Sequence, residues 1–167
     1  FLNTNFDSKS EFSLNVDNKF KIKNLIIKSN VQINNSEYQK PPILDDYFHK
    51  ENKTIQLKDH EIKLEYENNK LIIEGQGKIK LEEKFDEIKY KINLKDKNLT
   101  VYSKLKLSEL NIKRQEYLKF FFPEHDKKTT LKNQQIEINY NKNALSIKGL
   151  GKIKFSNEYE DINFNVS

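Results

Sequence analysis

The chain has 167 residues, which suits one domain or a segment of a repeat array. Its 30 basic and 25 acidic residues nearly balance, which argues against a nucleic-acid partner, because phosphate binding needs a concentrated basic stripe. It contains no cysteine, which excludes disulfides and thiol chemistry, and no apolar run approaches the roughly 20 residues of a membrane-spanning helix. Because the chain begins at Phe1 and stops within a strand-like pattern, we expect it to be an excerpt of a longer protein.

Alternation of apolar and charged residues predicts nine strands. They fall near residues 10–17, 19–34, 61–67, 70–82, 86–95, 98–112, 130–140, 143–156 and 159–167. The short links between them favour antiparallel neighbours and therefore a meander. Apolar residues spaced by three and four predict two short helices, at 41–48 and at 114–122, the second ended by Pro123.

The pattern repeats with a period of 74 residues. Residues 62–93 align with 136–167 without a gap, and 11 of the 32 pairs are identical. A shorter match at the same offset joins residues 23–33 to 97–107. The sequence therefore predicts one continuous array, with the end of a first unit at 1–48, a second unit at 49–122 and a partial third unit at 123–167.

Each predicted strand is apolar on one face and charged on the other. We assign to the apolar face Leu64, Tyr66, Leu71, Ile73, Gly75, Gly77, Ile79, Leu81, Ile88, Tyr90, Ile92, Leu99, Val101, Leu105, Leu107, Ile138, Tyr140, Leu145, Ile147, Gly149, Gly151, Ile153 and Phe155. Such a face must be hidden from water, and two short helices cannot cover nine strands. Either the sheet closes as a sandwich or barrel, or it curls into a trough whose lining meets an apolar ligand.

The long strands and the open repeat favour the trough. The predicted fold class is all-β: a curved antiparallel sheet, or β-groove, of about nine long amphipathic strands, with the two short helices between repeats. The glycine pairs Gly75–Gly77 and Gly149–Gly151 leave low spots on the apolar face. These could admit an acyl chain, or they could mark a bend or a slot for an aromatic ring.

No constellation of catalytic or metal-binding residues is apparent. The triplets around His60 and His125 resemble metal ligands, but neighbours in a strand point to opposite faces, and neither histidine recurs in the repeat. The third histidine, His49, stands alone. We therefore expect no enzyme activity, no metal and no cofactor. The lysines of the charged face are expected to be solvated, with attraction to anionic headgroups as the functional alternative.

The motifs resemble those of the AsmA-like family, especially its large YhdP and TamB type. They read Phe121-Phe122-Pro123, Ile136-x-Ile138-x-Tyr140, Leu145-x-Ile147-x-Gly149-x-Gly151-x-Ile153 and Tyr159-x-x-Ile162-x-Phe164. The resemblance covers most of the chain. It implies an envelope protein of Gram-negative bacteria, periplasmic and anchored in the inner membrane by parts outside this chain, whose long β-groove carries phospholipids toward the outer membrane.

Two functions from different classes follow. The first is non-enzymatic lipid transport, with phospholipid acyl chains on the apolar face and neighbouring repeats of the same chain continuing the groove. The second is a structural or adhesive β-repeat module, in which two sheets pack their apolar faces into a closed sandwich core. They differ in whether a second protein face covers the first.

Overall fold

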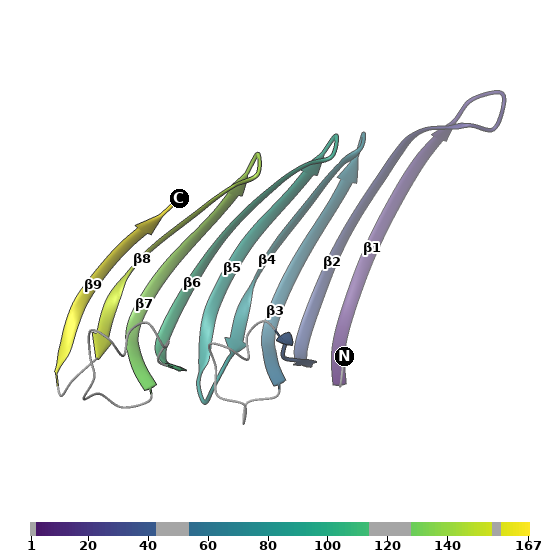
Figure 1. Cartoon of the computed structure of the whole chain (residues 1–167). Coiled ribbons are helices and arrows are strands. Elements are labelled where there is room, and N and C mark those ends of the chain that lie inside the picture. The colour runs from purple at the N-terminus through teal and green to yellow at the C-terminus, as the bar shows by residue number, and fades with distance from the viewer. Residues whose placement is uncertain (1–2, 43–53, 114–127, 155–157) are drawn as a thin grey trace.

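The computed structural model describes residues 3–42, 54–113, 128–154 and 158–167. They form one antiparallel sheet whose nine strands lie side by side in chain order (Figure 1). The strands are β1 (Asn3–Val16), β2 (Ile22–Gln39), β3 (Thr54–Glu67), β4 (Lys70–Lys80), β5 (Phe85–Lys95), β6 (Asn98–Lys113), β7 (Lys128–Asn141), β8 (Ala144–Lys154) and β9 (Tyr159–Val166). The predicted meander of amphipathic strands is confirmed.

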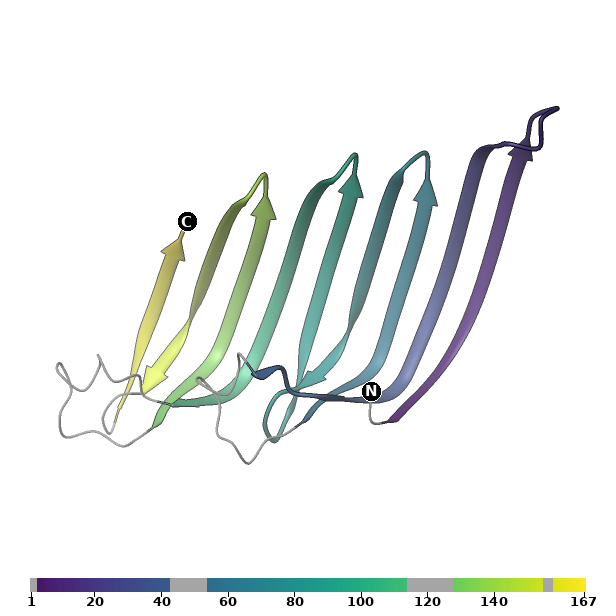
Figure 2. The same cartoon turned by 45° about the vertical axis from the view of Figure 1, so that its right-hand side comes forward.

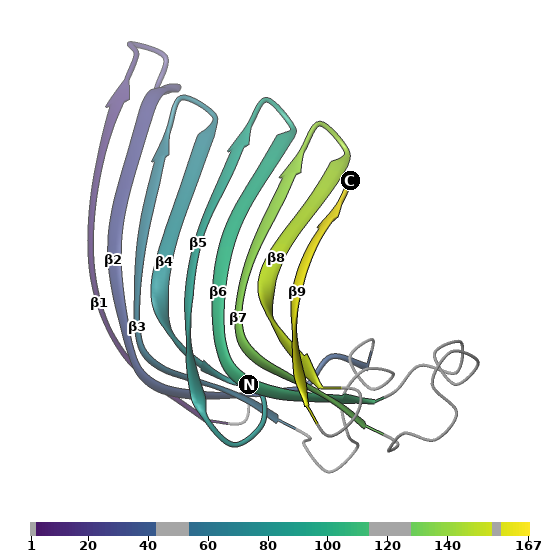
Figure 3. The same ribbon diagram turned by 90° about the vertical axis from the view of Figure 1, so that its left-hand side faces the viewer.

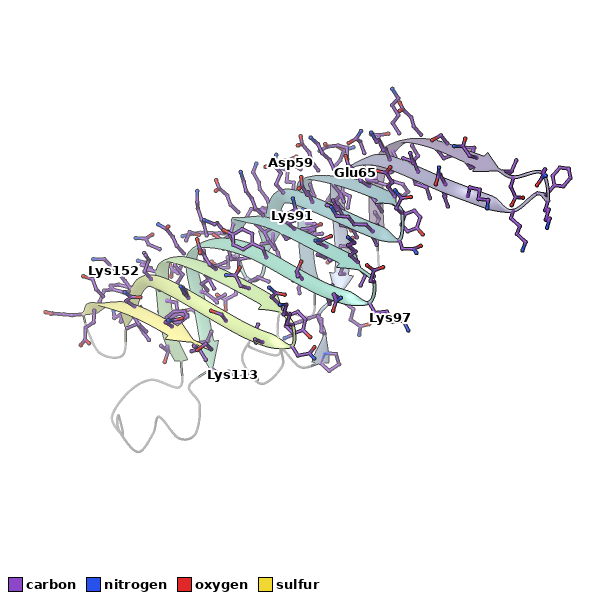
Figure 4. All side chains as sticks on the ribbon, turned by 90° about the horizontal axis from the view of Figure 1, so that it is seen from above. Asp59, Glu65, Lys91, Lys97, Lys113 and Lys152 are labelled. Carbon is purple, nitrogen blue, oxygen red and sulfur yellow. The ribbon has the colours of Figure 1, made fainter. Side chains whose placement is uncertain are left out.

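The sheet is a single curved layer. The strands bend along their length, so that the sheet has a concave and a convex side (Figure 3). Figure 2 shows this one layer from an oblique angle, and the view from above shows side chains on both of its sides (Figure 4). A sandwich needs a second sheet about 10 Å from the first, and the described residues do not form one.

Two sets of predictions lie outside the described residues. These are the short helix at 41–48, of which only residues 41 and 42 are described, the whole of the short helix at 114–122, and the lining residue Phe155. The predicted boundaries between units, after residues 48 and 122, and the histidines His49 and His125 lie there too.

Three hairpins have two-residue turns with positive φ at both positions: Asn68–Asn69, Asp96–Lys97 and Lys142–Asn143. Such turns match the twist of the strands they join. All three turns, together with the longer β1–β2 connection, lie at the same ends of the strands, the upper ends in Figure 1. We call this border of strand ends and turns the rim of the trough.

β3 and β7 each contain a bulge, and the bulge in β3 explains why the sequence predicted too short a strand there. Asp59 has φ 49° and Asn133 has φ 50°, and each lies where the pairing register to the next strand shifts. The extra residue moves the apolar positions of β3 from odd numbers (Leu57) to even numbers (Ile62). The sequence therefore predicts a strand only from residue 61, although β3 begins at Thr54.

The same local geometry recurs 74 residues along the chain. The two bulges, the turns at 68–69 and 142–143, and the pairs Ile62–Gly75 and Ile136–Gly149 occupy equivalent positions. Residues 59–75 and 133–149 therefore share their strand register.

Cross-strand ion pairs cover the charged face. Lys91 Nζ lies 2.6 Å from Glu74 Oε1, and Lys106 Nζ lies 2.9 Å from Glu87 Oε2. Hydrogen bonds from these lysines lower the pKa of both glutamates. Lys104 and Glu137 form a further pair at 2.6 Å. All these side chains are exposed, so each pair adds little to stability, and the face is built for contact with water.

Candidate ligand-binding trough

Apolar residues form continuous rows across the sheet. In one row each residue is the direct cross-strand partner of the next, from β3 to β8: Leu64, Ile73, Ile92, Val101, Tyr140 and Leu145. A second row, from β1 to β6, is Phe12, Ile27, Tyr66, Leu71, Leu94 and Leu99. Because direct partners share a face, each row runs along the trough, across the strands.

These rows are open rather than packed. Leu94 is 38% exposed, Leu99 40% and Leu145 50%, and the other members of the first row are half-buried. Only four apolar residues of the described chain are buried: Ile33, Leu107, Leu110 and Ile153. Within the described residues, therefore, no protein layer covers the rows near the rim.

The buried residues lie toward the opposite ends of the strands. Leu107 (3% exposed) and Leu110 (6%) pack together, and against them lie Leu81, Leu105, Ile112, Leu131 and Ile136. In a single layer, side chains shield one another this well only on the concave side, where bending brings them together. We infer that the apolar face lines the concave side, with this cluster at the bend.

The predicted lining residues divide between these two regions. Near the rim and in the middle lie Leu64, Tyr66, Leu71, Ile73, Ile92, Leu99, Val101, Ile138, Tyr140, Leu145 and Ile147, and toward the bend lie Ile79, Leu81, Ile88, Leu105, Leu107 and Ile153. Tyr66 and Tyr140 each donate their hydroxyl to an asparagine of the adjoining turn, Asn69 at 3.3 Å and Asn143 at 2.9 Å. Each tyrosine thus joins the apolar lining to the polar rim.

The four lining glycines have neighbouring side chains over them. A Cβ on Gly75 would overlap the Tyr90 ring, and a Cβ on Gly149 would overlap the Phe164 ring. The sequence left several roles open for these two glycines, and the structure shows one of them: each glycine leaves a slot that an aromatic ring fills. Burial in the slot raises the pKa of Tyr90.

We expect Gly149→Ala to destabilise the protein by about 1–3 kcal/mol, because the added methyl group overpacks against the Phe164 ring. Denaturant unfolding measures the effect. Gly149→Ala combined with Phe164→Leu, which removes the ring, should recover part of the loss. A destabilisation that persists unchanged in the double variant would contradict the slot.

The other two glycines lie under polar side chains. His60 covers Gly77, and Gln134, the residue 74 positions later, covers Gly151. Both side chains are 1% exposed. Gln134 Nε2 donates to the carbonyl oxygens of Lys132 at 3.1 Å and Lys152 at 2.8 Å, whereas neither ring nitrogen of His60 has a hydrogen-bond partner among the described residues. Burial lowers the pKa of His60.

Because the pKa of His60 is lower in the folded state than in the unfolded state, the imidazole is protonated first in the unfolded chain as the pH falls. The stability associated with neutral His60 is fully present above its unfolded pKa of about 6.5 and is lost as the pH falls below that value. We expect His60→Gln to fold, since Gln134 fills the equivalent position, and to show a smaller loss of stability between about pH 7.5 and 5.5. Urea unfolding of both proteins at the two pH values measures this. Equal pH dependence would show that His60 titrates normally.

Two acidic residues have roles that the sequence did not reveal. The β5–β6 pairing ends at Glu87 and Lys106. Beyond it, Asp86 Oδ1 accepts hydrogen bonds from Ser108 N at 2.7 Å and Ser108 Oγ at 2.8 Å, and Glu82 Oε2 accepts one from Asn111 N at 3.0 Å. These carboxylates take the place of the backbone hydrogen bonds that end with the β5–β6 pairing. The one signal in the sequence was that the alternation of its strand places Asp86 on the apolar face.

The described residues contain no cluster of three or more histidine, aspartate or glutamate side chains that could hold a metal ion. Nor does any helix of that part of the chain have the length and apolar character needed to cross a membrane. What the trough offers chemically is an extended apolar surface beside a polar rim.

Comparisons of the chain with protein-family models, curated proteins and solved structures gave no match.

Proposed function

We propose that this chain is a segment of a non-enzymatic lipid-transport protein in which phospholipid acyl chains lie on the concave apolar face. The observation that carries the proposal is the row from Leu64 to Leu145, which crosses six strands without a charged residue and without a covering layer among the described residues.

The magnitudes favour a lipid occupant. Each methylene group moved from water onto an apolar surface contributes up to about 0.8 kcal/mol, so an acyl chain along such a row gains several kcal/mol. The row holds no charged group that would fix the chain at one place. Neighbouring positions are similar in shape and chemistry, which is what sliding along the trough requires.

The sheet edges support a longer groove. Within the described residues, β1 and β9 pair on one side only. A neighbouring repeat that paired with either edge in the same register would continue both the sheet and the apolar rows. The resemblance to AsmA-like proteins adds the setting that we propose: a periplasmic protein, anchored in the inner membrane in its full length, that supports outer-membrane lipid homeostasis.

Site-specific photo-crosslinking in cells, with the full-length protein, tests the proposal. A photoreactive residue at Ile92, in the apolar row, should give lipid adducts, whereas one at Lys91, its neighbour on the charged face, should give none. Equal labelling of both positions, or none at either in a folded protein, would instead favour a structural or adhesive repeat.

A further inference from the structure

The rim of the trough is positively charged. The turns and the residues next to them (17–23, 67–70, 95–98 and 141–143) contain seven lysines and three carboxylates. One carboxylate is already engaged: Asp17 accepts hydrogen bonds from the backbone of Lys19 and Lys21 and pairs with Lys23 at 3.4 Å.

Two rim lysines share one hollow. A hollow of about 330 Å³ between the β5–β6 and β7–β8 turns is lined by Lys97, Asn98, Leu99, Tyr140, Lys142 and Asn143. Neither Lys97 nor Lys142 forms an ion pair with a described residue, and both are exposed. Figure 4 labels Lys97 at its hairpin tip. Lysine ammonium groups here are free to meet an anion.

The same hollow reaches the apolar lining. Leu99 belongs to one apolar row, and Tyr140 belongs to the other. A ligand that filled the hollow would therefore contact two ammonium groups and two amide side chains at the rim, and apolar side chains just inside it. That division of polar and apolar contacts matches a lipid with a phosphate headgroup.

The backbone conformation of the turns does not explain why lysine occurs at these two positions. Lys97 has φ 67° and Lys142 has φ 48°, a region that favours Gly, Asn and Asp. The equivalent position to Lys142 in the preceding unit is Asn68, and the equivalent to Lys97 is Lys23, which Asp17 neutralises. Neither equivalent position therefore carries an unpaired cation: one is Asn68, and the other, Lys23, pairs with Asp17.

We propose that the hollow between the β5–β6 and β7–β8 turns binds the phosphate headgroup of an anionic lipid, with Lys97 and Lys142 as its cationic contacts and the acyl chains entering the trough over Leu99. This inference rests on the proposed function and adds headgroup selectivity to it. The ammonium groups contact phosphate as point charges, so the selectivity should weaken as salt is raised.

The test is equilibrium binding of monomeric short-chain phosphatidylglycerol and phosphatidylcholine, with equal chain lengths, to the purified chain. We expect the anionic lipid to bind roughly ten- to thirtyfold more tightly, the effect of two lysines on a headgroup of net negative charge, because the choline ammonium of phosphatidylcholine offsets its phosphate charge. The double variant Lys97→Asn/Lys142→Asn should lower phosphatidylglycerol binding to the phosphatidylcholine level and leave phosphatidylcholine unchanged. Asn suits both turn positions, so this variant should fold at least as well, which thermal unfolding checks.

A control variant, Lys19→Asn/Lys21→Asn, removes the same charge from another part of the rim and should keep the preference. The inference is overturned if the wild-type chain shows no preference, if the double variant keeps it, or if both variants lose it equally. It is also overturned in favour of a free-phosphate site if inorganic phosphate alone competes as well as the lipid does. Phosphatidylcholine binding reports separately on the proposed function: if neither lipid binds any folded variant, lipid transport itself fails.

Discussion

Ile92→Asp is expected to reduce lipid binding by at least tenfold while leaving the sheet folded. Ile92 is half-buried in the middle of the apolar row, so the new carboxylate stays hydrated in the empty trough. An acyl chain that covers it must remove that water, at a cost of several kcal/mol. This cost exceeds the gain from the few methylene groups that contact one position, each up to about 0.8 kcal/mol. Fluorescent-lipid binding and photo-crosslinking from Val101 measure the loss.

Lys89→Asp is the matched control. Lys89 lies on the same strand as Ile92 but in the opposite phase, on the exposed charged face. Its replacement adds a carboxylate to water and should change stability by no more than about 0.5 kcal/mol and lipid binding very little. If both variants lose lipid equally, the charge acts through the overall field or the fold, and the row is not the binding surface.

Leu107→Ala is expected to have the largest effect on stability, about 3 kcal/mol of destabilisation. Leu107 is 3% exposed and packs against Leu110 at the bend, so its truncation leaves a cavity among side chains over which the described residues place no second layer. Chemical denaturation followed by circular dichroism measures the loss. A thin sheet with four buried apolar residues among those described has little other packing to compensate.

Leu99→Ala, a truncation of the same size on the same strand, should cost less than about 1 kcal/mol, since Leu99 is 40% exposed near the rim. The ratio of the two effects tests the division of the trough into a packed bend and an open lining. Comparable destabilisation by both variants would mean that the rim is covered as well as the bend, which would favour a closed core over an open trough.

The sequence by itself determined the strands, their antiparallel order and the face on which most apolar residues lie. Alternation has a period of two, so a residue such as Ile92 is assigned to a face by its neighbours alone, and short turns leave only adjacent strands to pair. Positions 74 residues apart, His60 and Gln134, each cover a glycine of the apolar face, although nothing in the sequence indicated this shared role.

Only the tertiary structure decided what each lining residue meets. Local alternation cannot reveal the bulges at Asp59 and Asn133, because one extra residue reverses the parity and hides the early part of β3. Nor can it reveal that Tyr90 fills the space over Gly75, or that Lys97 and Lys142 share one hollow, since these contacts join different strands. Which part of an apolar face is packed and which is open depends on how the whole sheet bends, and that is a property of nine strands together.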